Sequence, residues 1–422
     1  MTLGRVFRHP MIWGMLVVTV IMGMLMTLGY LGAFLSPEDH THDAPFVLVN
    51  EDQGVEISGQ TTNFGEQVVA AITSSDAFGD KVEWHVLDSR DAALETLGDN
   101  EAYAAIVIPA LYSQQIAAIS QAATTGTATP ATIDVIMNSG AGAYTRNLAT
   151  TVTTGTIATI SDSVETQLVT ALGGDTAQVP VALADILTDP VVANTSDVAP
   201  TGGHTAGGNA AFYYALLLML GGFVGMDVIF LGLEMFMGRS VATRIVARVR
   251  GEAVPLTSFQ SWATRVGVSA LLAIVGGAAQ AWVAIGWLNM AVDETWPLVF
   301  FGMLAIFTSA MFTLLFLTLL GTPGLLLAIL VQTFLGAPSA RGIFPKEMLP
   351  TFYQWMGDIL PLRYITDGVR AIMFYGADAD AGVTRGIVGL AIIAAVSFVV
   401  SGLYAWVTSR REGVATPEVV LA

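Results

Sequence analysis

Two acidic residues stand inside an otherwise apolar run, and their types and spacing make them the first candidates for chemistry. Asp227 and Glu234 lie within residues 209–237, a run long enough to cross a bilayer as one helix. They are seven residues apart, so a helix places both on one face. A carboxylate at mid-membrane depth marks a transport pathway or a specific partner. The competing interpretation is a protonated carboxylate that only supports packing. For Asp227 the two interpretations are equally supported. For Glu234, which has Arg239 nearby in the sequence, the packing interpretation is favoured.

The intramembrane carboxylate at mid-span needs polar partners, and no Lys or Arg is expected deep in another span. Gln280 and Gln332 are the neutral candidates. Glycines Gly221, Gly225 and Gly232 fall on nearly the opposite side of the same helix. The four-residue spacing of the first two permits close helix approach. We therefore expect one face of this helix to pack tightly and the other to face a cavity or a partner subunit.

The composition divides the chain into an apolar part and an acidic part. Only 12% of the 422 residues are charged, whereas about 25% is usual in soluble domains. Residues 37–208 nevertheless hold 22 Asp and Glu against three Lys and Arg, a net charge of −19. The acidic balance argues against a nucleic-acid partner. The chain has no cysteine, which excludes disulfides and thiolate metal sites. The short His-Thr-His-Asp motif at residues 40–43 is interpreted as a solvated linker, so no metal site is expected.

Apolar runs of about 20 residues predict membrane spans. Five such runs cover residues 11–35, 209–237, 266–290, 296–320 and 386–408. A sixth, residues 325–335, is short, since it covers only about 17 Å at 1.5 Å per residue. Counted together, they predict six spans.

The basic residues then set the orientation, because cytoplasmic loops are enriched in Lys and Arg. Arg5 and Arg8 precede the first run, a basic segment follows the second, and Arg410 and Arg411 follow the last. Six spans place all of these on one side. We expect a bacterial plasma-membrane protein with both termini in the cytoplasm.

The predicted fold is a polytopic α-helical membrane protein with six transmembrane helices and an α/β extracellular domain inserted between helices 1 and 2. Residues 1–36 form the cytoplasmic N-terminus and first span, and residues 37–208 the extracellular domain. Residues 209–422 supply the other five spans, a cytoplasmic loop at 238–265 and an extracellular re-entrant segment at 337–385.

Short apolar runs predict the strands of the acidic domain. "PFVLVN", "KVEWHVL", "AYAAIVI" and "ATIDVIM" read as strands, and "RDAALETLG" between the second and third reads as a helix. A strand–helix–strand unit implies a partly parallel sheet. The Thr-rich residues 143–172 are expected to form a helical stalk that leans toward the membrane. Residues 173–208 are interpreted as a connector.

The region after the short span combines prolines with apolar and charged residues. Prolines break long helices, and backbone that enters a bilayer without crossing it must be buried in protein. We expect short helices that dip in from the outer face, although an amphipathic hairpin on the membrane surface is the alternative. The residues singled out are Pro345, Pro350, Pro361, Arg363, Asp367 and Arg370, with Arg363 and Asp367 at helix-pair spacing.

Four arginines cluster between the second and third spans: Arg239, Arg244, Arg248 and Arg250. The intervening apolar residues make this segment amphipathic if it is helical. One interpretation is an anchor on anionic lipid, and the other is a docking helix for a cytoplasmic partner.

With these features together, the whole chain resembles type-2 ABC exporter permeases, and within them the phage-infection-protein (Pip)-like group. The resemblance is carried by "VNEDQG" at the start of the external domain, by the pattern Leu360, Pro361, Tyr364 and Arg370, and by the topology. It implies a dimer of permeases, each resting on a separate ATPase that receives the arginine segment as a coupling helix. Such permeases export hydrophobic or amphipathic compounds, lipids or peptides by alternating access. The external domain is smaller than in many Pip-like members.

No ATP site of the Walker type is present in this sequence. The two lysines are Lys81 and Lys346, and neither follows a Gly-x-x-x-x-Gly pattern. The expectation is therefore a transporter subunit rather than an enzyme, with no cofactor of its own and with ATP and Mg²⁺ on the partner. The alternative is a non-transporting receptor or secretion-accessory scaffold that displays the acidic domain. The sequence does not identify the cargo.

Overall fold

The computed structural model divides into two compact units. It describes residues 37–57, 59–75, 77–125, 128–171, 181–237 and 256–414, together with Met24. One unit runs from Glu38 to Gly203 and is called the α/β unit here; the other contains the described residues from His204 onward and is called the helical unit. The first predicted span, residues 11–35, and the arginine segment both lie outside the described residues, apart from Met24.

The α/β unit is built on a five-stranded sheet of order β4-β1-β5-β6-β7. The strands are β1 (Ala44–Asn50), β4 (Val82–Leu87), β5 (Ala104–Ile108), β6 (Ala131–Met137) and β7 (Val191–Asp197). β4 and β5 lie on either side of β1 and both run parallel to it, while β6 runs antiparallel to β5. The predicted strand–helix–strand unit is thus confirmed, with α5 (Arg90–Gly98) as its helix. A small hairpin of β2 (Val55–Ile57) and β3 (Gln60–Thr62) lies apart from the sheet.

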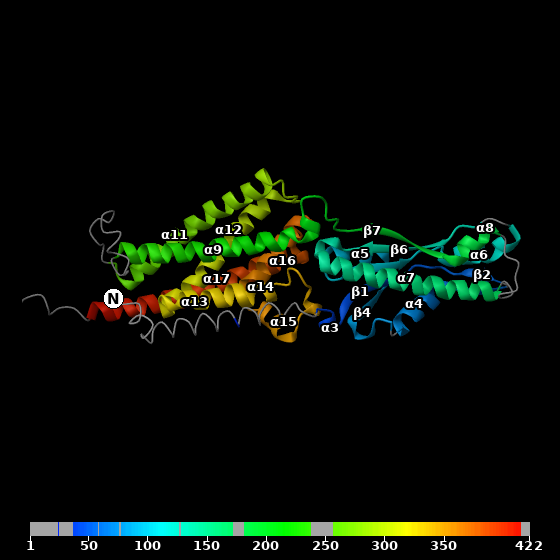
Figure 1. The fold of residues 1–422 in the computed structure, drawn as a ribbon, viewed down its shortest axis with the longest axis horizontal. Coiled ribbons are helices and arrows are strands. Elements are labelled where there is room, and N and C mark those ends of the chain that lie inside the picture. The colour runs from blue at the N-terminus through cyan, green and yellow to red at the C-terminus, as the bar shows by residue number, and fades with distance from the viewer. Residues whose placement is uncertain are drawn as a thin grey trace, which may run out of the picture. The chain divides into compact units, whose positions relative to one another are not determined.

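The long Thr-rich helix is not a free-standing stalk. α7 (Ala143–Ala171) runs along the sheet (Figure 1), and it contacts β5, β6 and β7. Its apolar positions Val152, Ile160 and Val164 are almost fully buried in the core clusters of the unit. The predicted helix over residues 143–172 is confirmed, and it packs on the sheet because its few apolar residues make one buried stripe among the threonines.

The expected connector also contains regular structure. α8 (Val181–Thr188) is followed by β7, which pairs in parallel with β6 along its whole length. Only the first residue of β7 is buried, and its other residues are mostly exposed. A polar edge strand of this kind lacks the apolar alternation by which strands are recognised in a sequence. The remaining helices are α3 (Pro37–His40), α4 (Phe64–Ser74) and α6 (Tyr112–Thr125).

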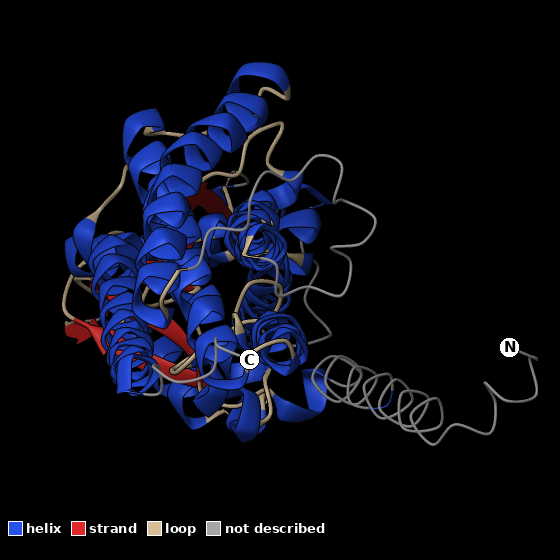
Figure 2. Ribbon diagram, turned by 90° about the vertical axis from the view of Figure 1, so that its left-hand side faces the viewer, coloured by secondary structure: helices blue, strands red, loops and turns tan. Residues whose placement is uncertain are grey.

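The helical unit contains four helices long and apolar enough to cross a membrane, which indicates a membrane protein. They are α9 (Ala210–Phe236), α11 (Ser258–Ala281) with its π-helical continuation Trp282–Trp287, α12 (Thr295–Leu320) and α17 (Thr384–Val414) with the turn Ala379–Val383 before it. They match four of the predicted spans. Figure 2 views several of these helices nearly along their axes.

α11 begins eight residues earlier than predicted. The Thr257 side chain accepts the backbone amide of Gln260, and the Gln260 side chain accepts the amide of Thr257. This capping box satisfies two of the amide groups that a helix start leaves unpaired. The consequence is that Arg265 lies inside the helix and not in the loop before it.

Between α12 and α17 the chain forms only short helices. α13 (Pro323–Ile329), the π-helical turn Leu330–Leu335 and α14 (Gly336–Ser339) make up the short apolar segment, followed by α15 (Thr351–Gly357) and α16 (Pro361–Phe374). α16 is largely buried and contacts α9, α12 and α17. A Cβ added at Gly368 would overlap the Phe301 ring of α12, so the approach of these two helices requires glycine there.

Candidate functional site

Asp227 lies at the middle of α9 and is half-buried. Its Oδ1 atom is shielded from solvent and has no hydrogen-bond partner among the described residues. An unpaired carboxylate in apolar surroundings is costly, so it must be protonated or must bind something. The expected pairing with Gln280 or Gln332 does not occur in the described part of the chain. Asp227 therefore remains the strongest intramembrane candidate for a site.

Gln332 is engaged elsewhere, in a buried network with α12. Its Oε1 lies 2.7 Å from the Ser309 hydroxyl, and its Nε2 donates to the Thr313 hydroxyl at 2.7 Å. All three side chains are fully buried. Hydrogen bonds of this kind hold helices together where no water is present. Gln332 is thus a packing residue that ties the short apolar segment to α12.

Glu234 pairs with Arg265, a residue that the sequence reasoning missed. Arg265 Nη2 lies 2.6 Å from Glu234 Oε1, and its guanidinium stacks on the Phe230 ring at 4.3 Å. The arginine side chain is 8% exposed. The expected partner, Arg239, is outside the described residues. Arg265 was assigned to the loop before the span and lies instead near the start of α11, because the helix begins early; the Thr257–Gln260 capping signal could have revealed this.

Two of the three predicted packing glycines face other helices. A Cβ at Gly221 would overlap the Gln280 amide nitrogen, and one at Gly225 would overlap the Leu272 side chain, both on α11. Gly232 has no described neighbour within 4 Å of an added Cβ. Gly222, which the sequence reasoning passed over, approaches backbone directly, since a Cβ there would overlap the carbonyl oxygen of Ile306 on α12. α9 is therefore packed on two sides rather than on one.

The start of α16 carries a cluster of ion pairs. Arg363 lies against Asp358 and is 3.6 Å from Asp367, the pair expected from their spacing. Arg341 joins Asp358 at 3.0 Å, and Arg385 joins Asp367 at 3.8 Å. The arginines 341 and 363 have side chains only 14% and 12% exposed. Three guanidinium groups, those of Arg341, Arg363 and Arg385, thus share the carboxylates of Asp358 and Asp367.

Arg370 does not extend that ion-pair cluster, although its spacing suggested that it would. It is buried and donates to the Gly342 carbonyl at 3.0 Å, so it holds the loop before α15.

The prolines have distinct local roles. Pro350 precedes the first residue of α15, Pro361 is the first residue of α16, and Pro345 precedes a short 3₁₀ turn. Proline suits a helix start because its missing N–H would be unpaired there.

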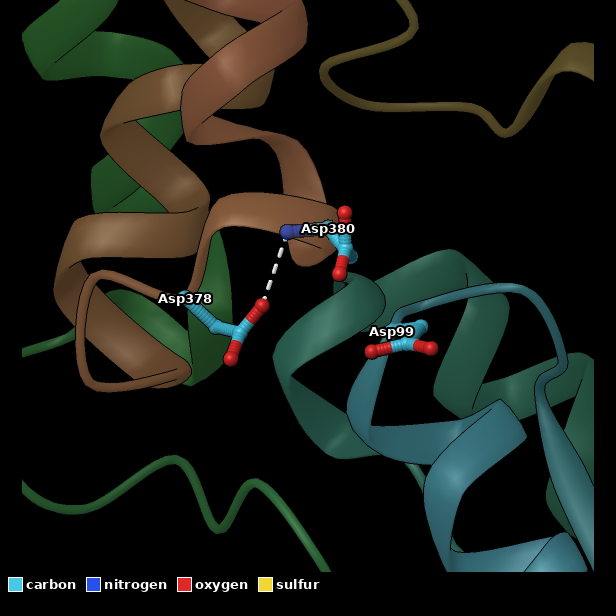
Figure 3. Close-up of side chains that lie close together, drawn as sticks. All are labelled: Asp99, Asp378 and Asp380. Carbon is cyan, nitrogen blue, oxygen red and sulfur yellow. Dashed lines mark hydrogen bonds between the residues drawn. The ribbon is translucent and has the colours of Figure 1, made fainter.

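An acidic loop enters α17. The Asp378 carboxylate accepts the backbone amide of Asp380 at 2.8 Å (Figure 3) and that of Ala381 at 3.3 Å. This contact caps the turn that begins the helix. Asp99, also drawn in Figure 3, belongs to the α/β unit. The two amides that Asp378 accepts belong, like Asp378 itself, to the helical unit. His42 and Asp43 of the short histidine motif are exposed, with their side chains 3.5 Å apart.

The "VNEDQG" stretch has a structural role that the sequence did not reveal. It follows β1, and its acidic side chains bind the first amides of three helices. Glu51 accepts the backbone amide of Arg90 in α5 at 2.9 Å. Asp52 accepts the Gly65 amide in α4 at 3.1 Å and the Ser113 amide in α6 at 2.9 Å. Negative charge at helix starts is favourable, so these two residues organise the carboxyl end of the sheet.

Comparison with known proteins gives one family and one relative. A family model described as protein of unknown function (DUF3533) matches residues 14–394. The uncharacterized protein YhgE of Bacillus subtilis (strain 168) is 30% identical over 193 residues, which cover 44% of this chain. The matched region spans about a quarter of that relative, 24% of its length. No solved structure matches the chain.

Proposed function

Since the chain belongs to the DUF3533 family, whose function is unknown, we propose from its architecture that it is the membrane permease subunit of an ATP-driven ABC exporter. In this proposal two permease copies form one transporter, and each rests on a separate cytoplasmic ATPase. Alternating access between the copies moves a hydrophobic or amphipathic compound, lipid or peptide outward. Six spans with both termini in the cytoplasm place the α/β unit outside the cell.

The observation that carries the proposal is the burial of α16 among spans. A helix of 14 residues covers about 21 Å at 1.5 Å per residue, too short to cross the hydrocarbon core. It is nevertheless buried against α9, α12 and α17. Polar backbone ends within a membrane are tolerated where protein surrounds them. Short helices before the last span are what the prolines and apolar residues of this segment led us to expect.

The close contacts of α16 support a tightly fixed position. A Cβ added at Gly389 of α17 would overlap the Tyr364 ring, and one at Gly386 would press on the Tyr364 carbonyl and the Phe301 ring. An amphipathic hairpin lying on the membrane surface would not need glycines on a spanning helix beneath it. These contacts therefore favour the re-entrant interpretation over the surface hairpin.

In this proposal the energy source is a separate ATPase, in keeping with the lack of a Walker-type phosphate loop in the sequence. The arginine segment between α9 and α11 is the proposed ATPase contact. We expect Arg244→Glu/Arg248→Glu to reduce recovery of the co-purified ATPase at least tenfold, because it reverses two charges at the contact. The control is Arg410→Glu/Arg411→Glu, which makes the same charge change at the C-terminal end of α17. Unchanged ATPase recovery and unchanged export in the first variant would refute the coupling role.

Labelling tests the orientation independently. The natural chain has no cysteine, so single cysteines can be placed cleanly. A membrane-impermeant maleimide is expected to modify Asp162→Cys, an exposed position on α7, in intact cells. Arg244→Cys is expected to react only after permeabilisation. Reaction of Arg244→Cys in intact cells contradicts the topology on which the permease proposal depends, and a receptor or scaffold role would then be the better account.

A further inference from the structure

A cavity of about 720 Å³ opens on the α/β unit between α4, β4 and α7. Its inner wall is apolar and nearly fully buried, with Val68 and Ile72 from α4 and Ile160 and Val164 from α7. Partly buried aromatic rings complete the wall: Phe64, Phe78 and Trp84. The volume falls in the range of about 300–1,000 Å³ that small-molecule sites occupy, and such sites are mostly apolar.

Two hydroxyl groups among the lining residues are buried and have no hydrogen-bond partner among the described residues. They are Tyr112 Oη, at the start of α6, and Thr156 Oγ1, on α7. Tyr112 is 0% exposed and Thr156 is 6% exposed. Leaving a buried hydroxyl unpaired costs about 1–3 kcal/mol, so such groups are normally satisfied. A bound polar group at this position would remove that cost.

The Thr156 hydroxyl departs from the pattern of its own helix. Its neighbours Thr153 and Thr159 donate to the carbonyls four residues earlier, at 2.7 and 2.9 Å. Thr156 lies on the cavity side and makes no such bond among the described residues. The pKa of Tyr112 is raised by burial and, secondarily, by the Asp52 carboxylate, so its phenol stays protonated and can donate. Both groups thus lie at the cavity wall without a partner among the described residues.

The charge around the cavity restricts the class of ligand. Among the described residues that line it, Glu83 is the only charged one, and no basic side chain is present. The surrounding residues 37–208 carry a net charge of −19. An anionic head group would find no cation to pair with and would be repelled by this field. Neutral and cationic head groups meet no such opposition.

We propose that this cavity binds a neutral or cationic amphipathic small molecule, with its apolar body against the α4 and α7 side chains and its polar group at the Tyr112 and Thr156 hydroxyls. The site is separate from the membrane spans and needs neither an ATPase nor transport. The inference therefore goes beyond the permease proposal and can be tested when that proposal fails.

Photo-crosslinking on the full chain in lipid nanodiscs tests the site by location. Three probes share one alkyl chain bearing a diazirine and differ in the head group: a primary amine, an alcohol and a carboxylic acid. The amine and the alcohol are expected to label peptides containing residues 64–84 and 156–167, as mapped by mass spectrometry. The acid is expected to label them at least tenfold less. Labelling confined to the apolar helices, or equal labelling by the acid, would overturn the proposal.

Matched variants exclude non-specific labelling. Ala71→Trp places a large ring at an exposed position on the cavity wall and is expected to reduce labelling at least tenfold. Leu111→Trp adds a tryptophan at a position that is 56% exposed and outside the cavity, and is expected to change nothing. Tyr112→Phe removes one unpaired hydroxyl and should weaken the alcohol and amine by about five- to tenfold. Unaltered labelling in both Ala71→Trp and Tyr112→Phe would refute the site, provided circular dichroism shows both folded.

Discussion

The two units of this protein both bury large apolar side chains but differ in the polar groups buried with them. In the α/β unit the fully buried residues include Phe46, Leu48 and Ile106. In the helical unit several of the fully buried residues are polar, among them Gln332 and Ser309. Water drives large apolar groups inward, whereas lipid exerts no such force between apolar helices, so small residues and hydrogen bonds hold those helices together.

The exposed surface of the helical unit carries large apolar side chains. In the helical unit Val275, Trp287 and Phe300 are 67%, 70% and 63% exposed. In a soluble domain such a continuous apolar surface would cause aggregation. The difference teaches that each unit is folded for its own solvent. A given substitution should therefore have different consequences in the two units.

The largest effect is expected where two helices of the helical unit touch through a glycine. Gly222→Ala should destabilise this unit by about 3 kcal/mol or more, because the added methyl group overlaps the Ile306 carbonyl. Gly232→Ala is the matched control and should be neutral or slightly stabilising, since no described atom lies within 4 Å of its Cβ. Thermal melting in detergent, followed by size-exclusion chromatography, measures both. Equal stability of the two variants would remove glycine contact as the basis of packing here.

A smaller loss is expected at the helix starts of the α/β unit. Asp52→Ala should cost about 2–3 kcal/mol, because it leaves the buried Gly65 and Ser113 amides unpaired. Glu56→Ala, an exposed acidic position on β2, serves as the control. Limited proteolysis of the full chain would report the change as faster cleavage within residues 60–125. If Asp52→Ala and Glu56→Ala are cleaved alike, a stabilising role of Asp52 at the starts of α4 and α6 is excluded.

The ion pair of the helical unit should contribute less than that. Glu234→Gln is expected to cost about 1–2 kcal/mol, since the almost fully buried Arg265 loses its counter-charge while Glu234 itself is 23% exposed. Arg265→Met in the same chain should recover most of the loss, because it removes the uncompensated charge. Melting temperatures of the two single variants and the double variant form the test. A loss in the double variant equal to the sum of the two single losses would show that the pair is not coupled.

The smallest effect is expected for the corresponding pair in the α/β unit. Arg90 and Asp134 lie side by side with side chains 38% and 19% exposed. Arg90→Met should cost at most about 0.5–1 kcal/mol, because water screens a partly exposed pair. The measurement is the melting temperature at low and at high salt. We expect it to depend on salt in the unmodified chain and to depend on salt less in the Arg90→Met variant. If Arg90→Met lost more stability than Glu234→Gln, the ion pair of the α/β unit would be the stronger one, contrary to this expectation.

Several elements could be predicted from the sequence because the local signal was complete. The apolar runs around α9 and α12 end at turn residues, and the structure ends those helices within two residues of the expected positions. The pair Arg363 and Asp367 followed from helix spacing alone. α11 was misjudged because the predicted boundary followed hydropathy, whereas the capping box sets the start of the helix.

Other features had no local signal. β7 is polar because it lies at the edge of the sheet, and only its pairing with β6 identifies it as a strand. The stripe that buries α7 consists of a few apolar residues among many threonines, and the sheet beneath it makes that stripe a core. The other two arginines of the ion-pair cluster, Arg341 and Arg385, come from the loop after α14 and from α17. Pairings over such distances along the chain depend on the packing of the whole unit.

The amino-acid sequence by itself determined that this protein has an acidic α/β region and apolar helices for a membrane, because composition decides which solvent each segment can face. Only the tertiary structure decided which polar groups meet. Glu234 pairs with Arg265 and not with the expected Arg239, and Gln332 bonds Ser309 and Thr313 and not Asp227. Tyr112 and Thr156 both line one cavity. Hydrogen bonds act over about 3 Å, so residues far apart in sequence become partners only when packing brings their atoms that close.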